Sequence, residues 1–251
     1  MFDLTLGALW VQARNVEQRL RDLRAGGWAG LGGLAIFDPA GALDPKDVDG
    51  KAVLVDEADI EGPGDWNLYA MGAGEVVGVS DTRNARGYDI DTLGITIGAD
   101  RRLGDHFALG LALGYLGSEA DLEGAGHVDV NGGMATLYGT WHDGGLHVDG
   151  AVGGGINSYD TRREGLEGRP RGSTCGTEFD ALLGGGYDFR IGAFAFGPDV
   201  AVQYGYAEFD AFEETGSLAP LDIQSNDSES LLTRLGIRGA AEFLCGGIRV
   251  R

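Results

Sequence analysis

The segment that most restricts the fold is residues 105–122, whose sequence is DHFALGLALGYLGSEADL. Every second residue from Phe107 to Tyr115 is large and apolar, and the residues between them are alanine or glycine. A period of two is the pattern of a β-strand. A soluble strand with one buried face carries polar groups on its other face, and glycine weakens a strand unless something packs closely against it. The pattern therefore favours a strand whose large face meets lipid and whose small face lines an interior.

The same period recurs over residues 92–103, 145–157, 194–206 and 234–243. The large apolar side chains of these strands are expected to point outward, namely Leu93, Ile95, Leu109, Leu111, Leu113, Val148, Val152, Val200, Val202 and Ile237. The polar side chains between them are expected to point into the lumen, namely Asp100, Arg102, Asp149, Asp180, Asp188, Arg190, Asp199, Gln203, Arg234, Arg238 and Glu242.

The connections between these strands alternate in length. Short turns are predicted at 103–106, 142–145, 190–193 and 244–247, and long polar loops near 81–87, 117–127, 159–173 and 207–229. Short turns on one side and long loops on the other are typical of transmembrane barrels. Aromatic residues near the predicted strand ends would suit interfacial girdles: Tyr88, Tyr115, Trp141, Tyr159, Tyr187, Tyr204 and Tyr206. The fold class predicted is all-β, an antiparallel up-and-down transmembrane β-barrel preceded by an α-helix.

Composition narrows the choice of partners. The chain has 251 residues, 46 of them glycine, and a formal net charge of −20. Nucleic acid is an unfavourable partner because its phosphates attract basic surfaces. No run approaches the ~20 apolar residues of a spanning helix. The two cysteines, Cys175 and Cys245, are too few for a disulfide framework, and free thiols are the favoured interpretation.

Residues 4–24 are predicted to form a helix within an N-terminal segment, 1–25. An apolar stripe runs along it, and Arg14, Arg21 and Arg24 lie on the opposite face, with Arg19 beside the apolar stripe. An ordinary surface helix is one interpretation. The other is a cationic helix inside an acidic tube, where restricted water strengthens the attraction between charges. We expect the second: the lumenal charges of the helix would be Arg14, Arg19, Arg21 and Arg24, with Arg14, Arg21 and Arg24 near inward-facing acids.

Residues 26–65 are expected to be an acidic, turn-rich linker, and 66–251 the barrel. The linker approaches the spacing of a calcium loop through Asp47, Asp49, Gly50 and Asp56. Pro45 would occupy the first ligand position and has no side-chain oxygen, so a solvated acidic turn is favoured.

Motifs of enzyme chemistry are absent from the sequence. There is no G-x-S-x-G nucleophile elbow, and the cysteines form no C-x-x-C pair. His142 and His147 flank a predicted tight turn, but two histidines without a third ligand make a poor zinc site. The sequence therefore predicts no catalytic, cofactor-binding or metal-binding residues, and a protein that is not an enzyme.

From residue 66 onward the chain resembles the C-terminal translocator domain of autotransporters, the β-barrel of type V secretion. The resemblance lies in a succession of strands and in short sequence motifs such as "GAD", "GY", "YDTR" and "GYDF". The segments that carry it are YDIDTLGITIGADRRLGDHFALGLALGYLGSEADL, LYGTWHDGGLHVDGAVGGGINSYDTRR and FDALLGGGYDFRIGAFAFGPDVAVQYGYAEFDAFEETGS. The N-terminal ARNVEQRLRDLR is similar to the helix that the family places before its first strand. By resemblance, that helix would lie in the lumen and connect the barrel to an exported passenger.

The sequence departs from the family pattern at its C-terminal end. The family's barrel has twelve strands and ends in an aromatic residue that the outer-membrane insertion machinery recognises. Eight strands and the start of a ninth can be counted here, and the chain stops at GIRVR. We therefore expect an incomplete barrel that lacks its final strands.

The function expected is that of an outer-membrane translocator and anchor, which exports an N-terminal passenger to the cell surface. Its partners would be outer-membrane lipid, the passenger polypeptide in cis and the outer-membrane insertion machinery. The alternative is a binding module: a self-standing outer-membrane barrel adhesin with long surface loops, or a soluble β-sandwich adhesin. The basic helix ahead of the strands favours the translocator, because a small self-standing barrel has no evident use for it.

Overall fold

A computed structural model describes residues 2–24, 51–61, 66–79, 87–122, 126–165, 167–191, 194–241, 243–245 and 248–250. Glu242 and the positions of the suspected calcium loop from Pro45 to Gly50 lie outside these residues, as do the side chains of Asp56 and Cys245. Within the described part of the chain, the helix is not both long enough and apolar enough to cross a membrane.

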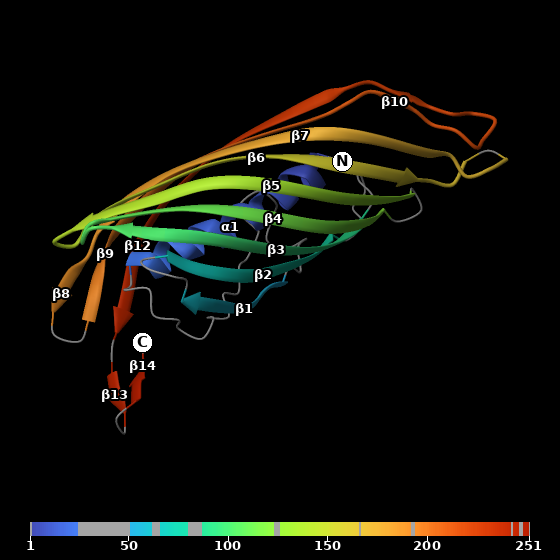
Figure 1. The fold of residues 1–251 in the computed structure, drawn as a ribbon. Helices are drawn as coiled ribbons and strands as arrows, with labels where there is room; N and C mark the ends of the chain where they lie inside the picture. Colours follow the sequence, from blue (N-terminus) through green and yellow to red (C-terminus); the bar gives the residue numbers. More distant parts are fainter. Residues whose placement is uncertain are drawn as a thin grey trace.

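One antiparallel sheet dominates the molecule and follows the order of the chain. Its long strands are β1 (Lys51–Glu61), β2 (Trp66–Val79), β3 (Tyr88–Leu103), β4 (Phe107–Leu122), β5 (Gly126–Asp143), β6 (Leu146–Arg162), β7 (Arg171–Tyr187), β9 (Phe194–Phe209) and β12 (Asn226–Ala241). Each strand pairs with the next in the order β1-β2-β3-β4-β5-β6-β7-β9-β12. The sheet arches over the helix α1 (Phe2–Arg24), which lies along its concave side (Figure 1). The predicted up-and-down topology is confirmed.

Three short pairings accompany the sheet. The strand β8 (Phe189–Ile191) pairs antiparallel with the start of β9, and β10 (Phe212–Glu213) pairs with β11 (Asp222–Ile223) in the connection between β9 and β12. The strand β13 (Phe243–Cys245) pairs only with β14 (Ile248–Val250) among the described residues. The start of a ninth strand expected after the turn at 244–247 corresponds to β14, which in the described residues pairs with β13 and not with the sheet.

The sheet is open. Its two outermost strands are β1 and β12, and within the described ranges no ladder joins them. The unpaired outer edge of β12 lies beside the most exposed apolar side chains, including Ile237 at 86% exposure. Unpaired strand edges are not tolerated in hydrocarbon, so the sheet as described is an incomplete barrel, as expected from the sequence.

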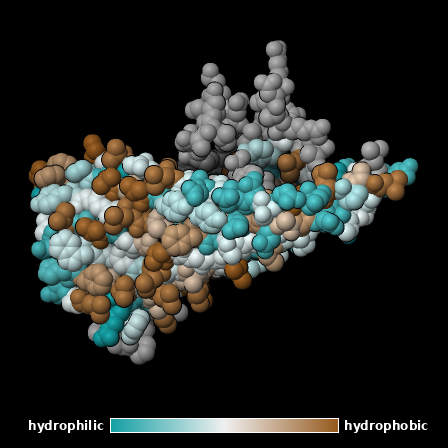
Figure 2. All heavy atoms as spheres, turned by 90° about the horizontal axis from the view of Figure 1, so that it is seen from above, coloured by the Kyte–Doolittle hydropathy of each residue, from teal (hydrophilic) through white to brown (hydrophobic). Residues whose placement is uncertain are grey.

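The outward face of the sheet is as expected, and the polar residues predicted to face the lumen are buried or half-buried where described, except for Arg102 and Arg190, which are exposed. Along β4, exposed residues alternate with buried ones from Phe107 to Leu113, and the small residues Ala108, Gly110 and Ala112 face the interior. The ten apolar residues predicted to face outward are all exposed. Brown, hydrophobic residues gather over one half of the outer surface, and teal, hydrophilic residues cover much of the half toward the other end (Figure 2). On β4 the apolar outward run spans Phe107 to Tyr115, which matches the ~9–11 residues of a membrane-crossing strand.

Several expected boundaries are wrong. Residues 51–61, assigned to the linker, form β1 and pair with β2 across a register shift between Val55 and Ala58. The loop expected at 117–127 is mostly strand, since Leu122 already pairs with Gly126. Strand pairing likewise shortens the loop expected at 159–173 to residues 163–170. It shortens the loop expected at 207–229 to residues 210–225, between β9 and β12. Strand pairing continues into these polar segments because their residues beyond the apolar band still alternate between two faces.

The aromatic residues expected in girdles divide between the two faces. Tyr115, Trp141 and Tyr187 are exposed on the outer face. Tyr159 is fully buried and packs against Phe209 on the inner face, so its assignment to a girdle is wrong. The reason is register: Tyr159 lies two residues after the inward Asn157 and shares its face.

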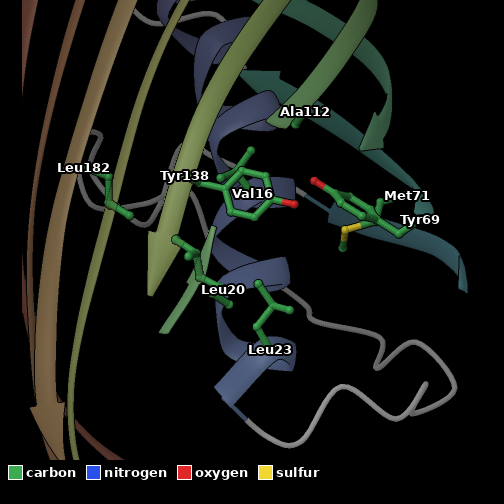
Figure 3. Close-up of a cluster of buried hydrophobic side chains, with 9 residues drawn as sticks. Val16, Leu20, Leu23, Tyr69, Met71, Ala112, Tyr138 and Leu182 are labelled. Carbon is green, nitrogen blue, oxygen red and sulfur yellow. The ribbon is translucent and has the colours of Figure 1, made fainter. Parts of the chain in front are cut away.

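The main apolar core lies between α1 and the inner face of the sheet. Val16, Leu20 and Leu23 of the helix pack against a cluster from several strands (Figure 3). The strand residues of that cluster are Tyr69, Met71, Ala108, Ala112, Tyr138 and Leu182. The apolar stripe of the helix therefore faces the inner surface of the sheet, called the wall below. Alanines on the strands leave room for the helix there.

Candidate functional site: the helix inside the sheet

The helix has a defined direction along the sheet. Near its C-terminal end, Arg24 forms an ion pair with Asp149, close to the short turn between β5 and β6. Toward its N-terminal end, Leu9 and Trp10 pack over Gly205, nearer the long connection after β9. The helix thus runs from the long-loop end of the sheet to the short-turn end.

A buried ion pair fixes the middle of the helix. The Arg19 Nε donates to Asp100 Oδ2 at 2.6 Å, and its NH2 group donates to Asp100 Oδ1 at 3.3 Å. The Arg19 guanidinium also lies 4.5 Å from the centre of the Tyr69 ring, within range of a cation–π contact. Arg19 and Asp100 are 1% and 0% exposed, respectively.

The carboxylate of Asp100 has further donors. Tyr138 Oη donates to its Oδ2 at 3.1 Å, and Asn67 Nδ2 donates to its Oδ1 at 3.2 Å. Desolvation of two charges is costly unless good geometry and further hydrogen bonds offset it. Here the pair is bidentate and the carboxylate also accepts hydrogen bonds from two strands, β2 and β5, so the arrangement meets that condition.

A neutral polar layer lies one helical turn from this pair. Asn15 Nδ2 donates to Thr96 Oγ1 at 2.8 Å, and Thr96 Oγ1 donates to Gln12 Oε1 at 2.9 Å. All three side chains are buried. Thr96 thus connects the two helix side chains, and these bonds fix the helix relative to β3.

Glycines on the strands make space for these side chains. A Cβ at Gly98 would lie 2.4 Å from the Tyr69 hydroxyl, and one at Gly110 would lie 2.4 Å from the Tyr138 hydroxyl. A Cβ at Gly114 would lie 2.1 Å from Gln12 Oε1. The small face seen in the sequence therefore has a packing role, because it accommodates tyrosines of neighbouring strands and polar groups of the helix.

Charged groups gather at the short-turn end of the concave face. His147 Nε2 lies 3.2 Å from Asp199 Oδ2, and Arg238 NH2 donates to Asp188 Oδ1 at 2.8 Å. Arg102 is exposed, but its NH2 group donates to the carbonyl oxygen of Leu23 at 3.1 Å. A cation at the carbonyl end of a helix is favourable, so Arg102 stabilises the last turn of α1.

The remaining helix charges also have partners. Arg14 NH1 lies 3.3 Å from Glu75 Oε2 of β2. Glu17 accepts from Arg234 of β12 at 2.7 Å and lies 3.5 Å from Arg21 within the helix. The expectation that Arg21 contacts an acid of the wall is wrong in the described residues, because its ion pair is with Glu17. Arg14 and Arg24 do contact acids of the wall.

Sequence reasoning includes Arg19 among the lumenal charges of the helix and Asp100 among the lumen-facing residues, but it does not pair them. Arg19, which lies beside the apolar stripe, is the most deeply buried cation of the described helix. Tyr69 and Tyr138 were not singled out, although both occupy inward positions in their strands. The signal available was their register: Tyr138 follows the exposed Leu137 and shares a face with the buried Thr136.

The histidines and acids of the described part of the chain were compared with the pattern of a metal site. That part of the chain contains no group of three histidine, cysteine, aspartate or glutamate side chains arranged to hold a metal ion. His142 and His147 are directly opposed across the β5–β6 turn. His147 contacts Asp199, and the ring of His142 lies 6.5 Å from that of His106, centroid to centroid.

A helix held inside a curved, outwardly apolar antiparallel sheet can now be compared with known proteins. The family model of the autotransporter beta-domain matches residues 68–251. This chain belongs to the autotransporter β-domain family. It is accordingly an outer-membrane translocator domain for passenger export. The role of such domains is transport and anchoring, and the family places the chain in an outer-membrane context with a passenger in cis.

A solved translocator domain has the same fold. The translocator domain of the autotransporter NalP from Neisseria meningitidis matches with a TM-score of 0.61 at 15% identity, covering 94% of this chain and 72% of that one. The siderophore receptor PiuA from Acinetobacter baumannii matches with a TM-score of 0.40 at 8% identity, covering 75% of this chain and 37% of that one. No curated protein matches the sequence.

Proposed function

We propose that α1 connects the sheet to an N-terminal passenger and occupies the interior after export. The observation that carries this proposal is the buried pair of Arg19 and Asp100, which holds the helix against the wall. The direction of the helix supports it as well, because its N-terminal end lies toward the long loops. In outer-membrane barrels the long loops face the cell exterior, so a chain preceding α1 would emerge outside the cell.

The wall would be held in the outer membrane by its apolar band. Lipid contacts the outward faces of β2 to β12 in this proposal, and the insertion machinery of the outer membrane delivers the sheet there. The proposed domain boundaries are 1–25 for the helical segment, with the strands beginning at β1 and not at residue 66, since Lys51–Glu61 pair with β2. The inward charges would hold the helix and are not assigned a catalytic role.

A surface-display experiment tests the export role. A signal peptide and an epitope-tagged passenger are fused ahead of residue 1, and the fusion is expressed in a Gram-negative host. The tag is expected to be cut by protease added to intact cells. A matched fusion carrying Leu111→Arg and Leu113→Arg, which places two charges in the apolar band, is expected to leave the tag protected. If the tag of the unmodified fusion stays protected while the domain is recovered from the outer membrane, the domain does not export and the binding-module alternative is favoured.

A further inference from the structure

Two buried acids on the inner face of β7 lie apart from the ion pairs of the helix. Glu178 and Asp180 are 4% and 2% exposed, and they share the inner face because they lie two residues apart on the strand. Neither forms an ion pair among the residues that the structure describes. Buried charges in proteins are paired or coordinate a metal ion, and the described side chains offer these two carboxylates no cation. The arginines of α1 are engaged elsewhere, with Glu75, Asp100, Glu17 and Asp149.

The Asp180 carboxylate lies over a glycine of the neighbouring strand. Gly153 of β6 is directly opposite Asp180. The position that a Gly153 Cβ would occupy is 2.6 Å from Asp180 Oδ1 and 2.7 Å from Thr136 Oγ1 of β5, so these two oxygens lie close together. The methyl group of Met134 borders the same position at 2.5 Å. Gln203 hydrogen-bonds the carboxylate, but Asp180 Oδ1 itself has no hydrogen-bond partner within the described ranges.

Glu178 has the same arrangement in the next row of the wall. Gly155 of β6 is directly opposite it, and the position of a Gly155 Cβ would be 2.7 Å from both Glu178 Oε1 and the carbonyl oxygen of Gly133 on β5. Asn157 Nδ2 donates to Glu178 Oε2 at 2.9 Å. Both side chains are buried, yet Glu178 Oε1 and Asn157 Oδ1 have no hydrogen-bond partner in the part of the chain that the structure describes. The two rows therefore hold unsatisfied carboxylate oxygens beside a hydroxyl and a carbonyl oxygen.

We propose that Glu178 and Asp180 bind one calcium ion on the inner face of β7, with Thr136 and the carbonyl oxygen of Gly133 as neutral ligands. Calcium takes six to eight oxygen ligands from carboxylates, carbonyls and water in a flexible geometry, whereas magnesium demands a near-ideal octahedron. Ligands from two rows of a sheet, about 7 Å apart along each strand, suit the flexible geometry. The described residues contain no group of three histidine, cysteine or acidic side chains, so neutral oxygens complete the site. No sequence motif marks it, because its oxygens come from separate strands.

The helix covers the neighbouring position of the wall. Gly205 of β9 is directly opposite Asp180, and a Cβ there would lie 3.1 Å from the Trp10 ring and 3.2 Å from Leu9 Cδ2. An ion bound to Asp180 would therefore lie close to an apolar part of α1, where excluded water strengthens its attraction to the carboxylates. The inference goes beyond the proposed function, because it concerns charges of the wall that the helix does not compensate.

Isothermal titration of the full chain with calcium chloride tests the proposal. The chain is folded in detergent micelles, stripped with EDTA and titrated at about 0.15 M salt, which screens weak attraction to exposed acids. We expect one calcium ion to bind per chain, and magnesium to bind at least about tenfold more weakly. The melting temperature should rise with the calcium concentration, because a ligand that binds only the folded state stabilises it. These measurements need no variant.

Two variants locate the ion. Asp180→Asn and Glu178→Gln are each expected to weaken calcium binding at least about tenfold, because each removes a charged ligand. In EDTA the Asp180→Asn chain should melt at a higher temperature than the unmodified chain, since it buries one uncompensated charge fewer. The matched control is Glu208→Gln, which changes an acid on the outer face of the same part of the sheet, opposite Thr177, and should leave binding unchanged.

The proposal is overturned if calcium neither binds the unmodified chain nor raises its melting temperature, in which case the two acids are held by protons. It is also overturned if the Glu178→Gln, Asp180→Asn double variant binds calcium as the unmodified chain does, since exposed acids would then be the ligands. Binding in micelles does not depend on passenger export, so failure of this inference is distinguishable from failure of the proposed function.

Discussion

Asp100 of β3 accepts two hydrogen bonds from Arg19 of α1, the shorter at 2.6 Å, and neither side chain has more than 1% of its surface exposed. This contact joins residues 81 positions apart in the sequence. It is a direct electrostatic link between the helix and the wall, and it lies in the middle of the helix. Its removal is the sharpest test of what holds α1 inside the sheet.

Asp100→Asn is expected to destabilise the folded domain by about 3–5 kcal/mol, because it leaves the Arg19 guanidinium buried without a counter-charge. The measurement is urea unfolding of the domain in detergent micelles. Asp91→Asn, which changes an exposed acid on the same strand, is the control and should shift stability little. The double variant Arg19→Met, Asp100→Asn should recover part of the loss, since neither charge then remains. Equal stability of Asp100→Asn and the unmodified chain would show that this pair does not hold the helix.

Gly110→Ala is expected to displace the Tyr138 ring, since the added Cβ would lie 2.4 Å from the Tyr138 hydroxyl. The hydrogen bond from Tyr138 to Asp100 is then lost, and the cost is about 1–3 kcal/mol, as for other overpacked sites. Gly150→Ala is the matched control on the sheet, because nothing lies nearer to its Cβ than the Leu182 carbonyl oxygen at 4.0 Å. Thermal melting of the two variants side by side checks the prediction, and equal melting temperatures would refute it.

The sequence was sufficient to predict the sidedness and topology of the sheet, because a period of two places every residue of a strand on one face or the other. It was not sufficient for β1. The segment KAVLVDEADIE mixes apolar and acidic residues, and its pairing with β2 is a long-range contact that local pattern does not report. Tyr159 shows a different failure: its position near a strand end suggested a girdle, although its register with Asn157 already placed it on the inner face.

The charges of the helix were predicted less well than those of the strands. The helical periodicity predicts which residues share a face of the helix. It does not predict which residue of the sheet each of them will contact. Arg19 is predicted as a lumenal charge without an acid assigned to it, because it lies beside the apolar stripe, yet apolar surroundings are what bury its pair with Asp100. Arg21 was favoured because it lies on the basic face, and its ion pair is with Glu17 of the same helix. Which of the two meets the wall depends on how the helix rotates, and packing of Val16, Leu20 and Leu23 decides that rotation.

Leu111→Arg tests the apolar band. Leu111 is exposed in the middle of the outward run of β4. An arginine there should destabilise the membrane-inserted domain by about 2–4 kcal/mol if it lies near the bilayer midplane. Glu119→Arg on the same strand lies beyond the band and should cost about 0–1 kcal/mol. Folding equilibria in lipid vesicles measure both, and equal costs at the two positions would place the band elsewhere on the sheet.

The stability of the end of the β4–β5 hairpin should depend on pH, because His127 titrates there. Its Nδ1 lies 2.6 Å from Asp121, and its Nε2 lies 2.9 Å from Asp129. The hydrogen bond to Asp121, followed by that to Asp129, raises the pKa of the imidazole above 6.5. Glu119 on β4 and Asp160 on β6 add negative charge around it, and Arg162 adds positive charge through its bond to Asp129.

A raised pKa in the folded state means that the folded hairpin binds the proton more tightly than the unfolded chain does. The stabilisation is therefore fully present below pH 6.5 and is lost as the pH rises through the raised pKa of His127. Amide hydrogen exchange at residues 121 and 127 should be slower below pH 6.5 than above the raised pKa, after correction for the intrinsic pH dependence of exchange. His127→Gln should abolish this difference, because the amide carries no titrating proton. His106→Gln, which changes an exposed histidine at the opposite end of the sheet, should retain it. Corrected exchange rates at 121 and 127 that do not vary with pH in the unmodified chain would show that the two aspartates do not hold the imidazolium.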